Sequence, residues 1–460
     1  MKYYHKNLII LSITSFLAAI SWNQVIPFLP LFLKELGVGE NSLYIWVAVV
    51  YAMQSCASII AQPLWGKLGD ATGRKPMIIR AGMFLTIIYF GMSFSQSALH
   101  LAIFRFLNGA LTGFIPGTFA LIATNTPEDE APAAVATAQA STAGGMIFGP
   151  AFGGILASIF GYRGSMRVSG TFAFIATILV LLFVKEVNKS KPSEKTTIIQ
   201  DFAFGFKSKV LLSVLIAVLV HSMCVSAITP MLVLHLKSLN LDMPKWFPIF
   251  LYLMPGFIMW GIVYKIGSSS GWIKNTKGKI AAIVFIIAAI AALSPIIKKL
   301  LVPSIDNMPS VMPDWFSGLV FSLPSLAFLI TARSWTSIGK NIKYENGIKI
   351  GLILSALFAI VISFVQNAWF FAVMFFVLGI WFASTSPLAS AITCQRIDEH
   401  FRGRAYAITQ SATMLGALVA PLGAGVVAKV YGIDAVFLSG GIVLILGTLL
   451  FSNAVKKWEK

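Results

Sequence analysis

Long apolar runs alternate with short polar segments through the first 184 residues of the chain. Each run has roughly the 20 residues that a helix needs to cross the hydrocarbon core of a bilayer. The six runs cover residues 8–33, 43–63, 77–95, 99–122, 132–160 and 168–184. The pattern predicts an all-α membrane protein whose first domain, residues 1–184, is a six-helix bundle.

A polar stretch follows the sixth run and carries five lysines between Lys189 and Lys209. Its composition is that of a linker or a surface helix, which we place at residues 185–208. Basic segments stay on the cytoplasmic side of a membrane, so we expect this linker to be cytoplasmic. Apolar runs then resume, and residues 209–460 are predicted to form a second bundle.

One segment of the second half occurs twice. Residues 243–247 read Met-Pro-Lys-Trp-Phe, and residues 312–316 read Met-Pro-Asp-Trp-Phe, 69 positions further on. The repetition indicates an inserted helical hairpin at about 243–311, which raises the expected number of membrane segments to about 14. Chance similarity between two apolar hairpins is the alternative. In either case an even number of added spans leaves the C-terminus on the cytoplasmic side of the membrane.

The two halves also match each other weakly at a nearly constant offset. Trp65 begins a polar turn, and Trp335 begins a similar turn 270 positions later. A run of small residues with a proline, 145–154, matches 416–425 at an offset of 271. Two independent matches at nearly one offset indicate parallel halves related by duplication.

Composition supports the membrane prediction and limits the partners. Apolar residues make up 57% of the chain and charged residues 11%, whereas a soluble domain has roughly a quarter charged. The net charge of +18 comes mostly from Lys and Arg in alternate loops, which is typical of cytoplasmic loops and not of nucleic-acid binding. We therefore expect a multi-pass protein of a bacterial cytoplasmic (inner) membrane, with both termini cytoplasmic and no nucleic-acid partner.

The polar turn between the second and third runs, residues 66–75, reads Gly-Lys-Leu-Gly-Asp-Ala-Thr-Gly-Arg-Lys. It resembles the loop signature of the major facilitator superfamily, although Ala71 stands where that signature usually has a basic residue. The resemblance implies two six-helix bundles and a loop that acts as a cytoplasmic conformational latch. The residues that it assigns to this gating loop are Gly66, Asp70, Gly73 and Arg74.

Arg105 lies in the middle of the fourth apolar run, where a charged side chain is costly. Asn108 and Thr112 share its helical face, so a polar stripe points into a bundle or a cavity. The spacing resembles the superfamily's fourth-helix motif, and that resemblance implies a role in proton coupling. The alternative is an arginine bonded to neighbouring backbone carbonyls.

The fifth run contains closely spaced small residues and one proline. They resemble the motif associated with proton antiporters, with the matching positions Gly145, Gly149, Pro150, Gly153 and Gly154. Small residues four positions apart let helices approach closely, so ordinary helix packing is an alternative that is compatible with a transport role.

Other polar residues within apolar runs are candidates for proton coupling or substrate binding. His221 lies near the middle of run 211–236, and its reference pKa of about 6.5 suits proton exchange near neutral pH. A core histidine bonded to a backbone carbonyl is the alternative. A central cavity could be lined by polar and aromatic side chains, although each one alone could instead bond a neighbouring helix: Trp22, Asn23, Gln24, Gln54, Asn108, Gln139 and Gln410.

Acidic residues are missing from the middle of the runs. All 17 Asp and Glu fall in loops or at span ends, although Glu35 lies at the edge of the first run. A cavity with Arg105 and His221 as its titratable groups should prefer neutral or anionic substrates. No metal-ligand spacing, nucleophile elbow or phosphate loop is present, so we expect neither a metal, a cofactor nor an enzyme.

The resemblance to the drug–proton antiporter branch rests on three motifs in order and spans nearly the whole chain. The leading hypothesis is a monomeric, proton-coupled exporter of small amphipathic molecules that works by alternating access in membrane lipid. One rival is a dedicated transporter of an anionic metabolite such as a carboxylate siderophore. Another is a non-transporting membrane scaffold or receptor, which would have no need of an arginine at mid-membrane depth.

Overall fold

The computed structural model describes residues 3–127, 130–187, 208–241, 313–397 and 399–459. The predicted inserted hairpin at about 243–311 and most of the predicted linker at 185–208 therefore lie outside the described residues. The domain boundaries that depend on these segments remain predictions.

The described first half consists of helices. They are α1 (Tyr3–Val25), the short 3-10 helix η1 (Ile26–Phe28), α2 (Leu29–Glu35), α3 (Glu40–Thr72), α4 (Arg74–Ser93), α5 (Ala98–Leu111), α6 (Phe114–Asn125) and α7 (Ala131–Phe183). The described second half contains α9 (Lys209–Ser238), α12 (Asp314–Ile342), α13 (Tyr344–Ile362), α14 (Ala368–Arg396), α15 (Glu399–Tyr431) and α16 (Asp434–Glu459).

Eleven segments of the described residues are long and apolar enough to cross a membrane. One of them, α7, is two helices, because Gly161 interrupts it with φ 68° and ψ 174°. Counted this way, the described residues supply twelve spans, six before the linker and six after it. The prediction of an all-α polytopic membrane protein is confirmed.

The fourth span differs from the continuous helix that its apolar run predicts. It is divided into α5 and α6 at Thr112 and Gly113, and Gly113 has φ 142°. Only glycine adopts such a conformation without strain, so the break follows from the sequence at this one position. Thr112 still donates its hydroxyl proton to the carbonyl oxygen of Asn108, within the last turn of α5.

The structure divides into two compact units. The smaller contains residues 239–312 and 366–370, and in its described part the backbone N–H of Asn240 donates to the carbonyl oxygen of Gln366 at 2.9 Å. All the helical bundles discussed below belong to the larger unit, residues 1–238, 313–365 and 371–460.

The two halves of the larger unit repeat each other in space. The indole N–H of Trp65 donates to the carbonyl oxygen of Ala110 at 2.6 Å. The indole N–H of Trp335 donates to the carbonyl oxygen of Ile380 at 2.9 Å. Both pairs are separated by 45 residues and related by the offset of 270. The weak sequence repeat therefore corresponds to a structural repeat.

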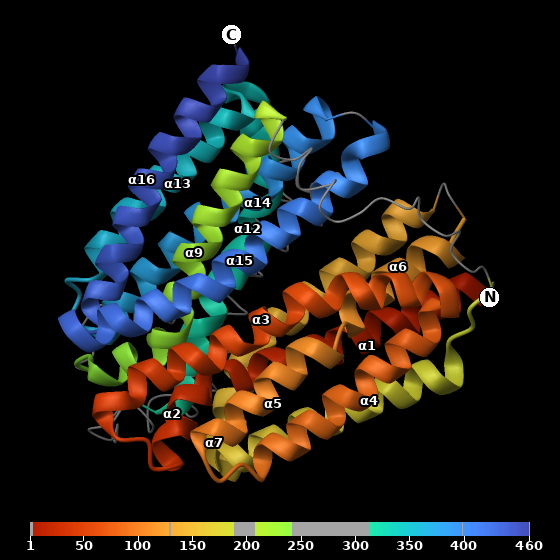
Figure 1. Ribbon diagram of the computed structural model, residues 1–460, viewed down its shortest axis with the longest axis horizontal. Helices are drawn as coiled ribbons and strands as arrows, with labels where there is room; N and C mark the ends of the chain where they lie inside the picture. The colour runs from red at the N-terminus through yellow and green to blue at the C-terminus, as the bar shows by residue number, and fades with distance from the viewer. Residues whose placement is uncertain (1–2, 128–129, 188–207, 242–312, 398, 460) are drawn as a thin grey trace, which may run out of the picture. The chain divides into compact units, whose positions relative to one another are not determined.

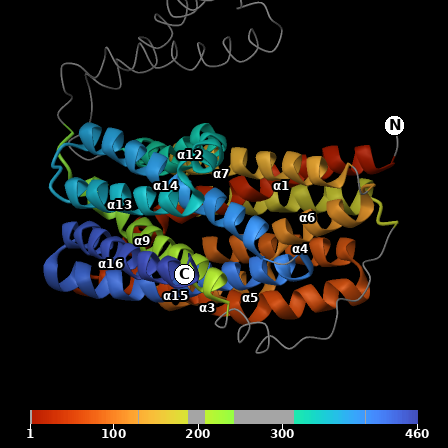
Figure 2. The same ribbon diagram turned by 90° about the horizontal axis from the view of Figure 1, so that it is seen from above.

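The two bundles contact each other mainly through two helix pairs. Figure 1 shows α3 beside α15, and Figure 2 shows α12 beside α7. A Cβ atom placed on Gly154 of α7 would lie 2.6 Å from the carbonyl oxygen of Asp314 on α12. A Cβ on Gly425 of α15 would lie 2.8 Å from the carbonyl oxygen of Tyr44 on α3. Since 44 and 314 also differ by 270, the interface has approximate twofold symmetry.

Each bundle has two ends, because successive spans run in opposite directions. We call them the Gly37 end, between α2 and α3, and the Gly73 end, between α3 and α4. One buried apolar cluster at the Gly37 end combines residues of both bundles, among them Phe32, Met92, Met231 and Val436. At the Gly73 end, each bundle has a buried apolar cluster of its own. Among the described residues, the two bundles therefore share a buried apolar cluster at the Gly37 end and not at the Gly73 end.

Candidate functional site

Arg105 is enclosed by α3 and α5 in the first bundle. Its side chain is 4% exposed, and its Nε has no hydrogen-bond partner among the described residues. The guanidinium carbon lies 5.7 Å from the centre of the Tyr51 ring. A buried guanidinium is stabilised by an aromatic face, but the Nε–H still lacks an acceptor. Arg105 therefore keeps hydrogen-bonding capacity that packing alone does not use.

The crossing of α3 and α5 brings further predicted site residues close to Arg105. A Cβ on Gly109 would lie 2.0 Å from the carbonyl oxygen of Gln54, so only glycine fits at this crossing. The hydroxyl of Ser58 donates to the carbonyl oxygen of Gly109 at 3.2 Å. Gln54 and Asn108 are both buried beside this contact. Arg105 and Asn108 of α5 and Gln54 of α3 thus all lie at or beside this crossing.

Gln24 and Asn23 are used for packing in the first bundle. The side-chain amide of Gln24 donates to the carbonyl oxygen of Ser165 at 3.2 Å and to the hydroxyl of Ser169, and the residue is fully buried. Asn23 donates to the carbonyl oxygen of Ala19, one turn back in its own helix, at 2.8 Å. These bonds correspond to the alternative of hydrogen bonds within and between helices, and the role of the two residues in lining a cavity stays a prediction. Trp22 is half-buried.

The small residues of α7 serve two different contacts. Gly145, Gly149 and Gly153 lie four residues apart and face α1, where added Cβ atoms would meet backbone or Cβ atoms at 2.2–2.7 Å. Gly154 faces α12 of the other bundle, and a Cβ on Gly318 of α12 would in turn lie 2.2 Å from the carbonyl oxygen of Pro150. The motif therefore packs α7 within one bundle and against the other.

The remaining predicted site residues lie on α7, α9 and α15. His221 is on α9 of the second bundle, where its ring is perpendicular to that of Phe382 at 5.1 Å between centroids. The Nδ1 of His221 is buried without a hydrogen-bond partner among the described residues, so this nitrogen does not make the carbonyl bond of the alternative interpretation. Gln139 on α7 and Gln410 on α15 are exposed.

The predicted gating loop is mostly helix. α3 continues through Thr72 and α4 begins at Arg74, so Gly73 alone makes the turn, with φ 105° and ψ 153°. The interpretation of residues 66–75 as a polar loop is wrong in this respect, because Gly66 and Asp70 lie in the last turns of α3. The side chain of Asp70 and the surroundings of Gly66 lie outside what the structure describes.

Glu186, which the sequence analysis missed, caps the helix that follows Gly73. Its two carboxylate oxygens accept hydrogen bonds from the backbone N–H groups of Arg74 at 2.7 Å and Lys75 at 2.9 Å. A carboxylate is favoured there by the free N–H groups and the dipole of α4. A Cβ on Gly73 would lie 2.9 Å from a Glu186 oxygen. The turn therefore requires both the glycine and the acidic residue that follows α7.

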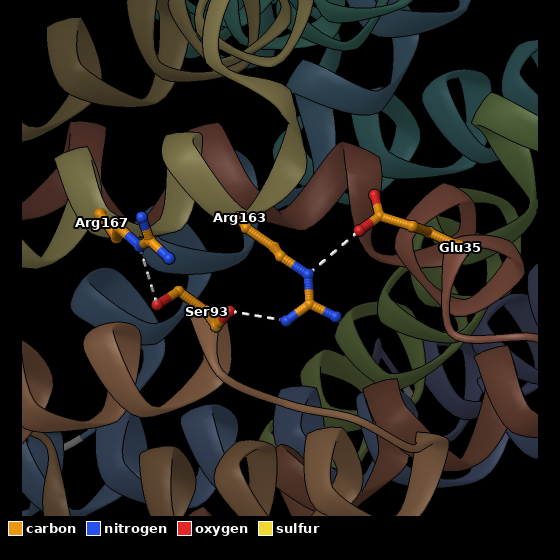
Figure 3. A network of polar contacts seen from close by, with 4 residues as sticks. All are labelled: Glu35, Ser93, Arg163 and Arg167. Carbon is orange, nitrogen blue, oxygen red and sulfur yellow. Dashed lines mark hydrogen bonds and ion pairs between the residues drawn. The ribbon is translucent and has the colours of Figure 1, made fainter.

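A second polar cluster at the Gly37 end was also missed. Figure 3 shows Arg163 between Glu35, whose carboxylate lies 3.1 Å from its Nε, and Ser93, whose carbonyl oxygen accepts from Nη1 at 2.8 Å. Arg167 donates to the hydroxyl of Ser93 at 3.4 Å. These side chains come from three separate segments of the first bundle, so no local motif could reveal them.

Two further acidic residues at the Gly37 end pair with basic partners in the second bundle. Asp314 accepts from the Lys237 ammonium at 2.8 Å and from the Tyr162 hydroxyl at 3.1 Å, and Tyr162 belongs to the first bundle. The Nδ1 of the buried His235 lies 2.9 Å from the carboxylate of Asp434. In the sequence, only the position of these charged residues at the ends of apolar runs indicated that they could form ion pairs. In the described part of the chain, no group of His, Cys, Asp and Glu side chains could hold a metal ion.

The sequence model described as Major Facilitator Superfamily matches residues 11–305 and 307–458. The chain belongs to the Major Facilitator Superfamily. Twelve spans in two bundles, the small-residue contacts of α7 and the buried Arg105 are thus features of a superfamily transporter, and a small-molecule substrate follows from the family.

Relatives of this superfamily member include bacterial proteins named for drug resistance. The Multidrug resistance protein MdtG of Enterobacter lignolyticus (strain SCF1) is 27% identical over 454 residues, covering 98% of this chain and 93% of that protein. The MdtG of Salmonella arizonae is 26% identical over 457 residues, covering 99% and 95%. The resemblance to the multidrug efflux branch is therefore confirmed at the level of homology.

Solved transporters share the fold at low identity. A bacterial homolog of the human lysosomal transporter Spinster, in an inward-facing and occupied conformation, gives a TM-score of 0.68 at 9% identity and covers 99% of this chain and 97% of that chain. The human organic anion transporter MFSD10 gives 0.61 at 14% identity, covering 98% and 100%. At these identities the likeness concerns the fold alone.

Proposed function

We propose that this chain is a proton-coupled secondary transporter that exports small amphipathic molecules across a bacterial cytoplasmic membrane. The observation that carries the proposal is Arg105, buried in the first bundle with an Nε–H that no described residue accepts from. Burying a charged group inside a membrane protein costs free energy, so its presence there favours a functional role. Relatives over nearly the whole chain are named for multidrug resistance, which favours export.

Alternating access is supported by the contrast between the two ends. The bundles share an apolar cluster at the Gly37 end and have separate clusters at the Gly73 end. A rocking motion would separate the Gly154 and Gly425 contacts and bring the Gly73 ends together, exposing a central site to the other side. By the distribution of basic residues, the Gly73 end and both termini face the cytoplasm.

In this proposal the Gly73 turn stabilises the other conformation, in which the Gly73 ends of the two bundles meet. Asp70 and Arg74 would form charge contacts there when the Gly73 ends meet, and Glu186 fixes the start of α4 so that Arg74 is correctly placed. Replacing Asp70 by Asn should leave the fold intact but slow transport strongly. His221, with its unpartnered Nδ1, is the proposed second proton-exchanging group.

An anionic metabolite is the second candidate substrate. It is favoured by the buried Arg105 and by the absence of acidic residues from the middle of the apolar runs. A monomer in a lipid bilayer is sufficient for either activity, because each bundle contributes its own polar residues.

Transport by proteoliposomes tests the proposal. Purified protein is reconstituted, a pH gradient is imposed, and accumulation of neutral, anionic and cationic fluorescent compounds is followed. We expect gradient-driven accumulation that Arg105→Ala abolishes and Arg105→Lys partly retains. If accumulation is the same with and without the pH gradient, the transport is not coupled to protons. If no compound accumulates, a scaffold or receptor is favoured instead.

A further inference from the structure

A groove runs along α4 from the Gly73 end of the first bundle into the membrane span. Its volume is about 590 Å³, within the range of roughly 300–1,000 Å³ that is usual for ligand sites. The residues that line it include Lys75, Ile79, Arg80, Met83, Phe84 and Ile87. The two basic residues lie towards the start of α4, and the last three of these residues are all apolar. The groove therefore has a basic end and an apolar end.

Arg80 is held in place at the basic end of this groove. Its guanidinium carbon lies 3.3 Å from the centre of the Trp65 ring on α3, and the indole N–H of Trp65 is bound to the carbonyl oxygen of Ala110. Stacking on an aromatic ring fixes the plane of a guanidinium and so the directions of its N–H groups. The Nε and Nη1 of Arg80 are buried and have no hydrogen-bond partner among the described residues. The charge of this arginine is therefore fixed in position and poorly compensated.

The described carboxylates do not neutralise the basic end of the groove. Neither Lys75 nor Arg80 forms an ion pair with a described acidic residue. The Lys75 ammonium donates one hydrogen bond, to the carbonyl oxygen of Leu181 at 3.0 Å, and has two further N–H groups. Glu186 already accepts from the backbone N–H groups of residues 74 and 75, at the start of α4. An anion at this end would therefore be bound by the two basic side chains and not by the helix N-terminus.

We infer that this groove binds an anionic phospholipid of the leaflet at the Gly73 end. The phosphate lies at Lys75 and Arg80, and one acyl chain follows Ile79, Met83 and Ile87. By the orientation proposed above, this is the cytoplasmic leaflet. The inference goes beyond the proposed function, because neither the transported compound nor the proton enters the argument.

The depth of each residue along α4 fits such a lipid. Arg80 follows Gly73 by seven residues, or about 10 Å along the helix, which brings it near the boundary between headgroups and hydrocarbon. Ile79, Met83 and Ile87 recur every four residues and lie on one side of the helix, at increasing depth. Met83 is 53% exposed and Ile87 is 61% exposed, so both are open to an acyl chain.

The repeated helix of the second bundle, α13, keeps the apolar part of this pattern but not the two basic residues. At the offset of 270, positions 83 and 87 correspond to Ile353 and Leu357, which are 51% and 52% exposed. The two basic positions correspond to Glu345 and Ile350, and the one lysine of this stretch, Lys349, corresponds to position 79. An apolar stripe is sufficient for contact with bulk lipid. The basic end of the first groove therefore indicates selection of the lipid by the charge of its headgroup.

Quenching of a fluorophore by brominated lipids tests the inference on the full-length protein in liposomes. Cys56, Cys224 and Cys394 are first replaced by Ser. A thiol-reactive fluorophore is then attached at Ile87→Cys or, as the matched control on α13, at Leu357→Cys. The liposomes are made of phosphatidylcholine with a small fraction of either phosphatidylglycerol or phosphatidylcholine whose acyl chains carry bromine. The chains of the two quenchers are identical, so a difference in quenching reports the headgroup.

We expect brominated phosphatidylglycerol to quench the label at position 87 at a much lower lipid fraction than brominated phosphatidylcholine does. Each basic residue near an anionic lipid surface contributes about fivefold in binding, so Arg80→Ile and Lys75→Gln should each reduce this preference about fivefold. Arg80→Lys, which keeps the charge, should retain most of it. The matched variant Lys349→Gln should leave the preference at position 87 unchanged, and the label at position 357 should show a smaller preference.

Equal quenching at position 87 by the two brominated lipids would overturn the inference. A headgroup preference that both Arg80→Ile and Lys75→Gln leave unchanged would also overturn it. Soluble glycerol phosphate distinguishes a lipid site from a site for a phosphate group alone. It should not reduce the quenching by phosphatidylglycerol, and if it does so at a concentration similar to that of the lipid, the groove does not hold the acyl chain and the inference fails. Transport enters none of these measurements, so the inference and the proposed function can fail independently.

Discussion

Lys343 adopts the backbone conformation that Gly73 adopts 270 residues earlier in the chain. Its φ of 68° and ψ of 141° compare with 105° and 153° at Gly73, and each residue precedes the helix that follows the long second helix of its bundle. Lys343 is the one non-glycine residue with positive φ in the described part of the chain. The second half has therefore kept the geometry of the turn after losing its glycine.

Lys343→Gly should stabilise the protein. A side chain in this region of backbone conformation costs about 1–3 kcal/mol, and glycine relieves it while losing roughly 0.5–1 kcal/mol to the flexibility of the unfolded chain. Lys343 is exposed, so little packing is lost. We expect a higher midpoint of thermal unfolding in detergent. The neighbouring exposed Asn346→Gly, inside α13, should lower the midpoint instead.

Gly73→Ala should have the opposite effect. The substitution combines the strain of a positive φ with a Cβ that would lie 2.9 Å from a carboxylate oxygen of Glu186. We expect a loss of about 1–3 kcal/mol in the free energy of unfolding. An unchanged unfolding midpoint would show that the turn can rearrange, and would weaken its proposed role as a latch.

The sequence predicted helical spans because an apolar run of about 20 residues is a local property of the chain. The predicted total of about 14 stays a prediction, since the hairpin at about 243–311 lies outside the described residues. The sequence also placed Arg105 and Asn108 on one inward face of the fourth span, since polar residues in apolar runs are expected to face inward, and both residues are buried. The offset of 270 found in the sequence relates the Trp65 and Trp335 hydrogen bonds directly.

The sequence could not predict which polar groups meet between helices that are distant in the chain. Asp314 and Tyr162 are 152 residues apart, and Glu186 meets Arg74 over 112 residues. These pairs depend on how helices are placed side by side, which no local pattern records. The bonds that Gln24 makes to Ser165 and Ser169 could not be predicted for the same reason, because these partners are distant in the chain.

Glu186→Gln should weaken the start of α4. The amide keeps an acceptor for one backbone N–H but loses the charge that interacts with the helix dipole, worth about 0.3–1 kcal/mol. We expect a small drop in the unfolding midpoint and a slower transport rate. Glu186→Ala should lower both further, because it leaves the N–H groups of Arg74 and Lys75 without this acceptor. If both variants transport at the wild-type rate, the cap has no part in the cycle.

Gly425→Ala and Gly423→Ala form a matched pair on α15. A Cβ at 425 would lie 2.6 Å from the Cβ of Ala48 and 2.8 Å from the carbonyl oxygen of Tyr44, whereas nothing lies within 4 Å of a Cβ at 423. Overpacking of this kind costs about 1–3 kcal/mol. Gly425→Ala should therefore lower the unfolding midpoint in detergent, and Gly423→Ala should leave it unchanged or raise it. Equal midpoints would mean that α3 and α15 are not in close contact.

Arg105 leads to a prediction about substrate charge. A buried guanidinium without an acidic partner among the described residues repels cations, and a low dielectric strengthens that repulsion. Proteoliposomes should therefore accumulate neutral and anionic amphipaths better than a permanent lipophilic cation. Arg105→Gln removes the charge and keeps hydrogen-bonding groups. It should reduce the difference in accumulation between anionic and cationic compounds and abolish the dependence on the pH gradient. Strong accumulation of the cation by the wild type would mean that a carboxylate near the span edges, such as Glu35 or Asp314, governs selectivity instead.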